Sequence, residues 1–321
     1  MMRRIWVAFA LAALAVASAP LPGLAQPKTV KVALTSKENL DNLPVFVALR
    51  MGFFTEAGLA VEPAYFRGGG EVVRAITTRS VDIGATPAAS AVLIAAARGE
   101  PIKILSGSTA PLVGIVWIVA ADSPIKTIRD LRGRKVGFSS PGSVTHVALQ
   151  NILKEEGLDR EVQIVRVGSP GDSWAAIKNK VVDAGWHISP AVYQLLATNE
   201  ARIVIDGAAY IKRYQQTVVA AMEDVLRKDP EMARSFLRAR AKAVKFIADE
   251  PDKTIALWAD ELGLPVAAVR LAYRDLPRGA YEAGAPKPEN LAATLAEVQS
   301  TGAIKQPPDL LTILDLTYLP R

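Results

Sequence analysis

The 321-residue sequence contains no cysteine. The chain therefore forms no disulfide, offers no thiolate nucleophile and cannot ligate zinc or an iron–sulfur cluster through sulfur. A lipid-modified N-terminal cysteine is excluded for the same reason. Histidine is almost as scarce, with only His146 and His187, and no third ligand lies at a recognisable metal-site spacing from them. We therefore expect neither a metal site nor a bound cofactor.

Dense blocks of like charge are also missing. The chain has 38 Lys and Arg against 32 Asp and Glu, a net charge of +6, and the basic residues are scattered. Because nucleic-acid-binding surfaces cluster their Lys and Arg side chains, we expect no nucleic-acid partner. Beyond the first 25 residues, no apolar run approaches the roughly 20 residues needed to span a bilayer.

The first 25 residues have the composition of an export signal. Arg3 and Arg4 precede an apolar stretch over residues 5–17, and small residues follow at 23–25, before Gln26. A charged start, a short apolar stretch and small residues at the cut are typical of a signal peptide. The sequence predicts a cleaved signal peptide over 1–25 and a mature protein that is soluble in the periplasm.

The remaining chain repeats itself. Residues 70–84 and 171–185 share Gly-Glu or Gly-Asp, Ala-Ile, Val-Asp and Gly at identical internal spacing, an offset of 101 residues. Shorter similarities precede this match, at 31–36 with 135–140 and at 56–59 with 155–158. A unit of this size exceeds the about 20–50 residues of solenoid repeats and is that of a small domain. We predict two similar lobes with the functional site between them.

Strands and helices alternate in both predicted lobes, which indicates parallel α/β sheets. The predicted strands are 30–34, 59–62 and 81–85 in the first lobe and 134–138, 162–167 and 182–187 in the second. Helices are expected from Pro44 and after Gly70, and then over 144–157 and 172–180. A helical tail follows, with predicted helices at 232–247, 251–262, 265–275 and 288–300.

Two apolar, β-branched runs, 114–121 and 217–221, are predicted as strands on which the chain crosses between the lobes. The predicted division is 26–119 plus 220–321 for the first lobe and 120–219 for the second. The tail is expected to pack mainly on the first lobe.

The segment 48–62 reads Ala-Leu-Arg-Met-Gly-Phe-Phe-Thr-Glu-Ala-Gly-Leu-Ala-Val-Glu. It resembles the A-x-x-x-G-F-F-x-x-A-G-L-x-V signature of periplasmic substrate-binding proteins of the nitrate/sulfonate/taurine group of ABC transporters, also called NMT1/THI5-like. Supporting stretches follow in family order at 76–87, 130–136, 141–143, 182–184 and 229–231. The resemblance implies a bilobal α/β fold of the periplasmic-binding-protein type II class. Two lobes are joined by two crossing strands, the helical tail lies on lobe one, and hinge closure traps the ligand.

Three loops of each lobe are expected to face the ligand, because open α/β sheets bind at the carboxyl ends of their strands and helix N-termini favour anions. The predicted ligand-binding residues are Thr35, Ser36, Asp41, Asn42, Gly69, Gly70, Thr86 and Pro87 in the first lobe and Ser140, Gly142, Ser143, Thr145, His146, Asp172, Trp186, His187 and Ser189 in the second.

Several of these residues have a structural alternative. Ser143 and Thr145 can cap their own helix, the histidines can be capping or solvent-exposed groups, and Trp186 can be core. Asp82 and Asp183 recur with the repeat, and we assign both to turn structure. Arg67 and Arg166 end equivalent strands, where each can meet an anion or be a surface charge. Where many relatives have Glu-Pro, this chain has Ser189-Pro190, so no carboxylate contact is carried over.

The leading hypothesis is a non-catalytic receptor that takes a small anionic organic molecule, such as a sulfonate or carboxylate, to an ABC permease of the inner membrane. The family also implies nitrate, taurine or a pyrimidine as candidates. We expect a monomer that contacts its permease transiently. One alternative is an enzyme on the same fold, although a desulfinase would need the missing cysteine and a dehydratase would not be exported. Another is a ligand sensor for a membrane receptor.

Overall fold

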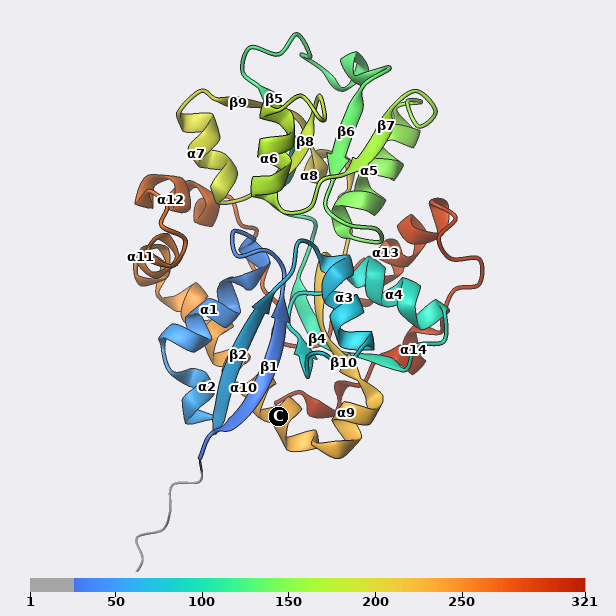
Figure 1. Cartoon of the computed structure of the whole chain (residues 1–321). Coiled ribbons are helices and arrows are strands. Elements are labelled where there is room, and N and C mark those ends of the chain that lie inside the picture. The colour runs from blue at the N-terminus through green and yellow to red at the C-terminus, as the bar shows by residue number, and fades with distance from the viewer. Residues whose placement is uncertain (1–25, 321) are drawn as a thin grey trace, which may run out of the picture.

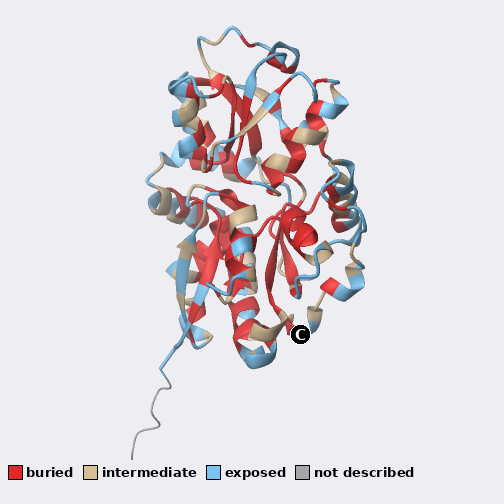
Figure 2. Cartoon of the chain, turned by 45° about the vertical axis from the view of Figure 1, so that its right-hand side comes forward, coloured by how far each residue is buried: buried red, intermediate tan, exposed pale blue. Residues whose placement is uncertain are grey.

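The computed structural model describes residues 26–320, so the predicted signal peptide lies outside the described residues. The described chain forms two α/β lobes, one above the other in Figure 1, each with a central sheet and helices on its faces. The buried residues concentrate on the strands and on the inward helix faces of both lobes (Figure 2). Within residues 26–320, no helix is both long and apolar enough to cross a membrane.

The first lobe holds a five-stranded sheet. Parallel pairing joins β1 to β2 and β3, and β10 runs antiparallel between β3 and β4. β1 is exposed at its start and buried over its final three residues, which enter the core. The sheet order is β2-β1-β3-β10-β4, with β1 (Lys28–Leu34), β2 (Leu59–Tyr65), β3 (Ile83–Gly84), β4 (Ile102–Thr109) and β10 (Thr217–Met222).

The second lobe reproduces this order. Its antiparallel sheet has the order β8-β5-β9, and β6 pairs in parallel with β7. A parallel bridge between Val136 and Ala184 connects the two pieces, so the spatial order becomes β7-β6-β8-β5-β9. The strands are β5 (Ile115–Ala120), β6 (Lys135–Phe138), β7 (Gln163–Arg166), β8 (Gly185–Ile188) and β9 (Ala201–Asp206).

The repeat also extends to the turns before the third strands. The Asp82 carboxylate accepts a hydrogen bond of 2.8 Å from the backbone N–H of Lys31, and Asp183 accepts the equivalent bond of 2.9 Å from Lys135. Each carboxylate ties the end of a helix–strand turn to the neighbouring strand. The assignment of both aspartates to structure is therefore confirmed.

The two crossing strands predicted from sequence are β5 and β10, and each lies wholly in one sheet. β5 pairs with β8 and β9 of the second lobe, and β10 pairs with β3 and β4 of the first. The predicted lobe boundaries, 119/120 and 219/220, therefore fall inside strands. We propose boundaries in the connecting segments 110–114 and 211–216 instead, because strand pairing keeps each strand within one sheet.

Helices cover both sheets. In the first lobe the helices and the 3-10 turn are η1 (Leu40–Asn42), α1 (Leu43–Arg50), α2 (Phe53–Glu56), α3 (Gly69–Thr77) and α4 (Ala89–Ala97). The second lobe has η2 (Ile128–Leu131), α5 (Val144–Glu155), α6 (Pro170–Lys178), α7 (Ala191–Ala197) and α8 (Gly207–Tyr210).

The tail contains α9 (Glu223–Lys228), α10 (Pro230–Asp249), α11 (Pro251–Leu262), α12 (Val266–Arg274), α13 (Pro288–Ser300), α14 (Leu310–Ile313) and η3 (Leu316–Tyr318). α10 and α11 pack on α1, as expected for a tail on the first lobe. α12 also contacts α7, and α13 contacts α5, so the tail touches both lobes. The tyrosine hydroxyl of Tyr193 donates to Asp275, and Asn151 of α5 donates to the Glu297 backbone carbonyl at 3.0 Å.

Candidate functional site

A small cavity lies between the two lobes, where β5 and β10 begin. We call it the interlobe cavity. It encloses about 20 Å³, little more than the space of one water molecule. Its lining comes from the carboxyl ends of the parallel strands and from helix N-termini of both lobes. The lining residues are Thr35, Ser36, Asn39, Asp41, Gly68, Gly69, Ala88, Ile115, Ser139, Ser143, Val144, Thr145, Trp186 and Thr217.

On the first lobe, a hydrogen-bond network fixes the loop after β1. The backbone N–H of Thr35 donates to the Thr86 hydroxyl at 2.9 Å, and that hydroxyl donates to Asn42 Oδ1 at 3.1 Å. Asn42 Nδ2 donates in turn to the Ser36 carbonyl at 2.9 Å. Asn42 and Thr86 thus lie behind the cavity and hold Thr35 and Ser36 at its wall.

Two hydroxyl groups in the wall are buried without a protein partner. Ser36 is 7% exposed and Thr217 is 1% exposed, and neither hydroxyl oxygen has a hydrogen-bond partner among the described residues. A buried hydroxyl that lacks a partner costs about 1–3 kcal/mol. Both side chains line the interlobe cavity, where a ligand can supply the missing hydrogen bonds.

On the second lobe, three hydroxyls gather at the N-terminus of α5. Ser139 donates from its hydroxyl to Ser143 Oγ at 2.9 Å, and its backbone N–H donates to Thr145 Oγ1 at 2.9 Å. Ser143 is also the N-cap of α5 and accepts from the backbone N–H of His146 at 3.2 Å. Capping and cavity lining therefore occur together at Ser143.

Glycine at 68 and 69 allows close contacts at the start of α3, one across the lobes and one within the first lobe. A Cβ atom at Gly69 would lie 2.6 Å from the backbone nitrogen of Ala88. A Cβ atom at Gly68 would lie 2.8 Å from the hydroxyls of Ser139 and Ser140 across the cavity. Because real Cβ atoms do not approach that closely, a larger residue at 68 would press against the second lobe, and one at 69 would displace Ala88 within the first lobe.

Asp41 is the charged residue of the lining and is only 3% exposed. Its carboxylate accepts a hydrogen bond of 2.8 Å from Gln216 Nε2, in the segment that crosses between the lobes. Burial raises the pKa of Asp41 from 3.8 to about 6, because the charged form loses water, and the hydrogen bonds that it accepts offset only part of this shift. The carboxyl is thus mostly ionised at neutral pH.

The structure brings some of the predicted ligand-binding residues together and separates others. Thr35, Ser36, Asp41, Gly69, Ser143, Thr145 and Trp186 line the interlobe cavity. The others do not: Asn42, Gly70, Thr86, Pro87, Ser140, Gly142, His146, Asp172, His187 and Ser189.

Most residues outside the lining have an identifiable place. Gly70, Gly142 and His146 line a separate cavity of about 350 Å³ between α3, α4 and α5. Asp172 completes the capping box of α6 with Ser169. His187 is buried in β8, where loss of water lowers its pKa to about 4.

Three other predicted residues lie close to the cavity wall or to the crossing segments, and Trp186 belongs to the lining itself. Ser140 is buried and its hydroxyl has no partner among the described residues, although it does not line the cavity. Pro87 accepts from the backbone N–H of Val218 at 3.2 Å. Ser189 faces a cavity beside the crossing segments instead. Trp186 is 2% exposed, and its indole N–H donates to the Gly168 carbonyl at 3.0 Å, so this nitrogen is paired within the second lobe.

Sequence reasoning missed Asn39, Gly68, Ala88, Ile115, Ser139, Val144 and Thr217 as lining residues. The loops predicted to face the ligand include 35–42, 68–71 and 139–146, which contain Asn39, Gly68, Ser139 and Val144, so these four could have been included. Ile115 and Thr217 begin the crossing strands, so their approach to the cavity depends on the arrangement of the lobes.

The arginines at the strand ends lie at the rim of the cavity and pair across the lobes. Arg166 binds the carboxylate of Glu71, and Arg67 lies 3.7 Å from Asp172. Both side chains are exposed, with 66% of the Arg67 side chain and 48% of the Arg166 side chain accessible to solvent. Each ion pair joins the two lobes at the rim of the interlobe cavity, and neither arginine is among the lining residues.

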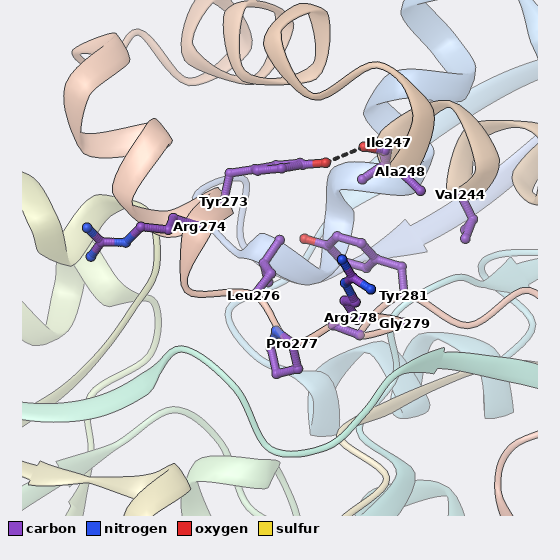
Figure 3. Close-up of a pocket in the computed structure, with 11 residues that line it drawn as sticks. Val244, Ile247, Ala248, Tyr273, Arg274, Leu276, Pro277, Arg278, Gly279 and Tyr281 are labelled. Atoms are coloured by element: carbon purple, nitrogen blue, oxygen red, sulfur yellow. Dashed lines mark hydrogen bonds between the residues drawn. The ribbon is translucent and has the colours of Figure 1, made fainter.

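A larger cavity of about 610 Å³ lies within the tail, between α10, α12 and the loop that follows α12 (Figure 3). The Tyr273 hydroxyl donates to the Ile247 carbonyl at its upper edge, at 2.5 Å. Apolar side chains form most of its wall, including Val244 and Leu276. Its lining residue Tyr281 pairs with Thr109 at the end of β4 and donates to the Leu40 carbonyl, so this cavity lies beside a strand end. All of its lining residues belong to the tail, however, and none comes from the second lobe. Size alone therefore does not identify the functional site, and the polar groups of both lobes favour the interlobe cavity.

Residues 39–254 match the model of the family described as NMT1/THI5 like. The putative aliphatic sulfonates-binding protein of Escherichia coli K12 is 28% identical over 212 residues, covering 65% of this chain and 64% of that protein. The chain thus spans just under two thirds of that relative. The riboflavin-binding protein RibY of Chloroflexus aurantiacus is 25% identical over 245 residues, covering 75% and 68%.

An enzyme is similar as well. The 4-amino-5-hydroxymethyl-2-methylpyrimidine phosphate synthase THI11 of Saccharomyces cerevisiae is 26% identical over 233 residues, covering 68% of this chain and 67% of the synthase.

Solved structures share the fold. The periplasmic aliphatic sulphonate binding protein SsuA of Escherichia coli superposes with a TM-score of 0.69 at 22% identity, covering 89% of this chain and 97% of that one. A Candida albicans protein with the generic periplasmic binding protein fold gives 0.77 at 15% identity, covering 91% and 98%. The bilobal fold expected from the sequence is therefore confirmed.

Proposed function

Because the chain belongs to the NMT1/THI5-like family, we propose that it is a solute-binding receptor of an ABC importer and that the interlobe cavity is its ligand site. The receptor works as a monomer in the periplasm, takes up a small organic ligand between its lobes and delivers it to a membrane permease. The sulfonate-binding relative supports a ligand that carries an oxyanion, such as a sulfonate or carboxylate.

One observation carries this proposal. Ser36 and Thr217 line a cavity that both lobes form, and their buried hydroxyls have no partner among the described residues. Buried polar groups in folded proteins nearly always have a partner, so an unpartnered pair at an enclosed interface favours a ligand at that point. Hydroxyl donors and the N-terminus of α5 suit the oxygens of an oxyanion.

The small volume of the cavity defines how the ligand enters. About 20 Å³ holds a single water-sized group, so even a compact organic ligand requires the lobes to lie further apart than in this structure. The two crossing segments, 110–114 and 211–216, provide the hinge for that movement. The loaded receptor would then be slightly more open than the arrangement in Figure 1.

The test is ligand-induced stabilisation of the chain from Gln26 onward, followed by calorimetry with the ligands that stabilise it. Sulfonates and carboxylates form the panel. A ligand present at 100 times its dissociation constant stabilises the folded state by about 2.7 kcal/mol. Absence of stabilisation and of calorimetric heat across both classes would contradict the proposed function.

A matched pair of variants locates the site. Ser36→Ala and Ser173→Ala each remove a buried hydroxyl that has no partner among the described residues, but only Ser36 lines the interlobe cavity. One hydrogen bond to a charged ligand contributes about 1.5–3 kcal/mol, so Ser36→Ala should weaken binding about tenfold or more. Ser173→Ala should bind as the wild type does. Equal affinities of all three proteins would place the ligand elsewhere.

The synthase relative makes an enzyme the second candidate. The two histidines, which could act as an acid or base, lie outside the cavity lining. His187 has its Nδ1 3.0 Å from its neighbour's backbone nitrogen, in a buried strand. A receptor returns its ligand unchanged, so prolonged incubation followed by NMR of the ligand distinguishes the two functions.

A further inference from the structure

The interlobe cavity contains a negatively charged residue, which would repel a ligand whose only charged group is an oxyanion. Asp41 provides a buried carboxylate in the wall, and no lysine, arginine or histidine accompanies it in the lining that the structure describes. Moving an ionised carboxylate out of water without a cationic partner is costly. An uncompensated carboxylate inside a ligand cavity therefore needs an explanation from the ligand.

The nearest cations are engaged elsewhere. Arg240, which is 1% exposed, exerts only a Coulombic influence on Asp41. Its guanidinium donates to the Ser108 carbonyl at 3.1 Å and to the Ser108 hydroxyl at 2.9 Å, and it also reaches the carbonyl of Glu282. The rim arginines bind carboxylates of the opposite lobe. Asp41 is left with neutral partners, the side chains of Thr109, Gln216 and Asn39.

The opposite side of the cavity is suited to a negatively charged group. The hydroxyls of Ser139, Ser143 and Thr145 surround the start of α5, a helix of 12 residues, and Gly69 opens α3 beside them. Helix N-termini carry partial positive charge and free backbone N–H groups, which favour an anion. The cavity thus combines a carboxylate wall with an oxyanion-binding wall.

We propose that the ligand is a compact zwitterion, with an ammonium group that pairs with Asp41 and an oxyanion held at the α5 side. This inference rests on the proposed function and specifies the ligand class of the same site. Asp41 is then the residue that selects amine-bearing acids over acids of similar size that lack the amine. The ammonium ion supplies the charge that Asp41 does not receive from the protein.

Asp41 also has a structural contact, which the test must separate from ligand recognition. Gln216 donates to Asp41 and accepts from the backbone N–H of Val113 at 2.8 Å, so it connects both crossing segments to the loop after β1. A purely structural Asp41 would alter the affinity for every ligand equally. A selecting Asp41 alters the ratio between ligands with and without an amine.

The experiment measures calorimetric affinities for matched pairs that differ in the amino group: taurine with ethanesulfonate, and β-alanine with propionate. Isethionate, which carries a hydroxyl in place of the amine, distinguishes a cation from a neutral donor. For the wild-type protein we expect the amine-bearing member of a pair to bind at least about thirtyfold tighter, the lower end for a buried charge pair. Asp41→Asn should remove that ratio, and Asp82→Asn, outside the cavity, should keep it.

The outcomes separate the two proposals. Binding of ethanesulfonate or propionate as tightly as their amine-bearing partners would overturn the role of Asp41 and leave the receptor function standing. A ratio that survives Asp41→Asn would also overturn it. If no sulfonate or carboxylate binds the wild type, the proposed ligand class fails together with the inference.

Discussion

Replacing Asp41 by asparagine should stabilise the ligand-free protein at neutral pH. The pKa of Asp41 rises from 3.8 in the unfolded chain to about 6 in the folded one, because burial penalises the charged carboxylate. A raised pKa means that the folded state binds the proton more tightly than the unfolded state does. The contribution of Asp41 to the free energy of unfolding is therefore greatest at low pH. It falls as the pH rises from about 4 to about 6 and stays at the lower level above that range.

The size of the effect follows from the shift. Roughly two pKa units at about 1.36 kcal/mol each give about 3 kcal/mol at pH 7.5. Asp41 is 3% exposed, so solvent screening reduces this value little. Asparagine keeps an oxygen that can accept from Gln216 and carries no charge. We expect Asp41→Asn to gain up to about 3 kcal/mol at pH 7.5 and to lose that gain as the pH approaches 4.

Urea unfolding followed by tryptophan fluorescence measures this difference. The free energies of unfolding of the wild type and Asp41→Asn are compared from pH 4 to pH 8, so that groups shared by both proteins cancel. A variant that is no more stable than the wild type at pH 7.5 would refute the reasoning. A gain that does not change with pH would refute it too, because the cause would then not be the buried charge.

Three further predictions concern the lobes and the repeat. A Cβ at Gly70 would overlap the Pro141 carbonyl across the lobes, whereas the equivalent Gly171 has no atom closer than 4.0 Å. Gly70→Ala should therefore hold the lobes further apart and enlarge the radius of gyration of the ligand-free protein in X-ray scattering, and Gly171→Ala should not; an unchanged radius for Gly70→Ala would contradict the close contact. Asn151→Ala removes hydrogen bonds between α5 and the tail, and it should speed ligand release several-fold in stopped-flow traces while the fold stays intact; unchanged release would show that this contact does not hold the lobes together. Asp82→Ala should cost about 1 kcal/mol in urea unfolding through its lost bond to Lys31 and leave ligand affinity unchanged.

The helices and strands with strong local signals were predictable from the sequence. Proline at the start of α1 and the Asp229-Pro230 start of α10 mark two helices, and Asp229 accepts from the Met232 backbone N–H at 3.1 Å as an N-cap. The predicted helix at 251–262 coincides with α11. α4 escaped prediction because seven of its residues are buried and its apolar side chains leave no helical period to detect.

The residues of the binding site were only partly predictable from the sequence. Loop position and residue type pointed to Thr35, Ser36 and Asp41, since strand ends of α/β sheets carry binding sites. The partner of Asp41 is Gln216, 175 residues further along the chain, and no local pattern connects the two. His146 and His187 were predicted as site residues because histidine is so scarce in the sequence. Neither lines the interlobe cavity, since tertiary packing places His187 in a buried strand and His146 beside a different cavity.

The place of β10 in the first sheet determines the order in which the molecule can be completed. β10 alone joins β3 to β4 in that sheet, through the pairing of Ala220 with Gly84 on one side and with Ile104 on the other. A ribosome delivers the second lobe before it delivers residues 217–222, so β4 waits without its sheet neighbour until then. The second lobe is contiguous and can fold first, whereas the first lobe closes only after a long loop has formed. Such distant pairing slows folding. A nascent chain that stops short of β10 would therefore carry an open sheet edge, a natural docking point for a chaperone.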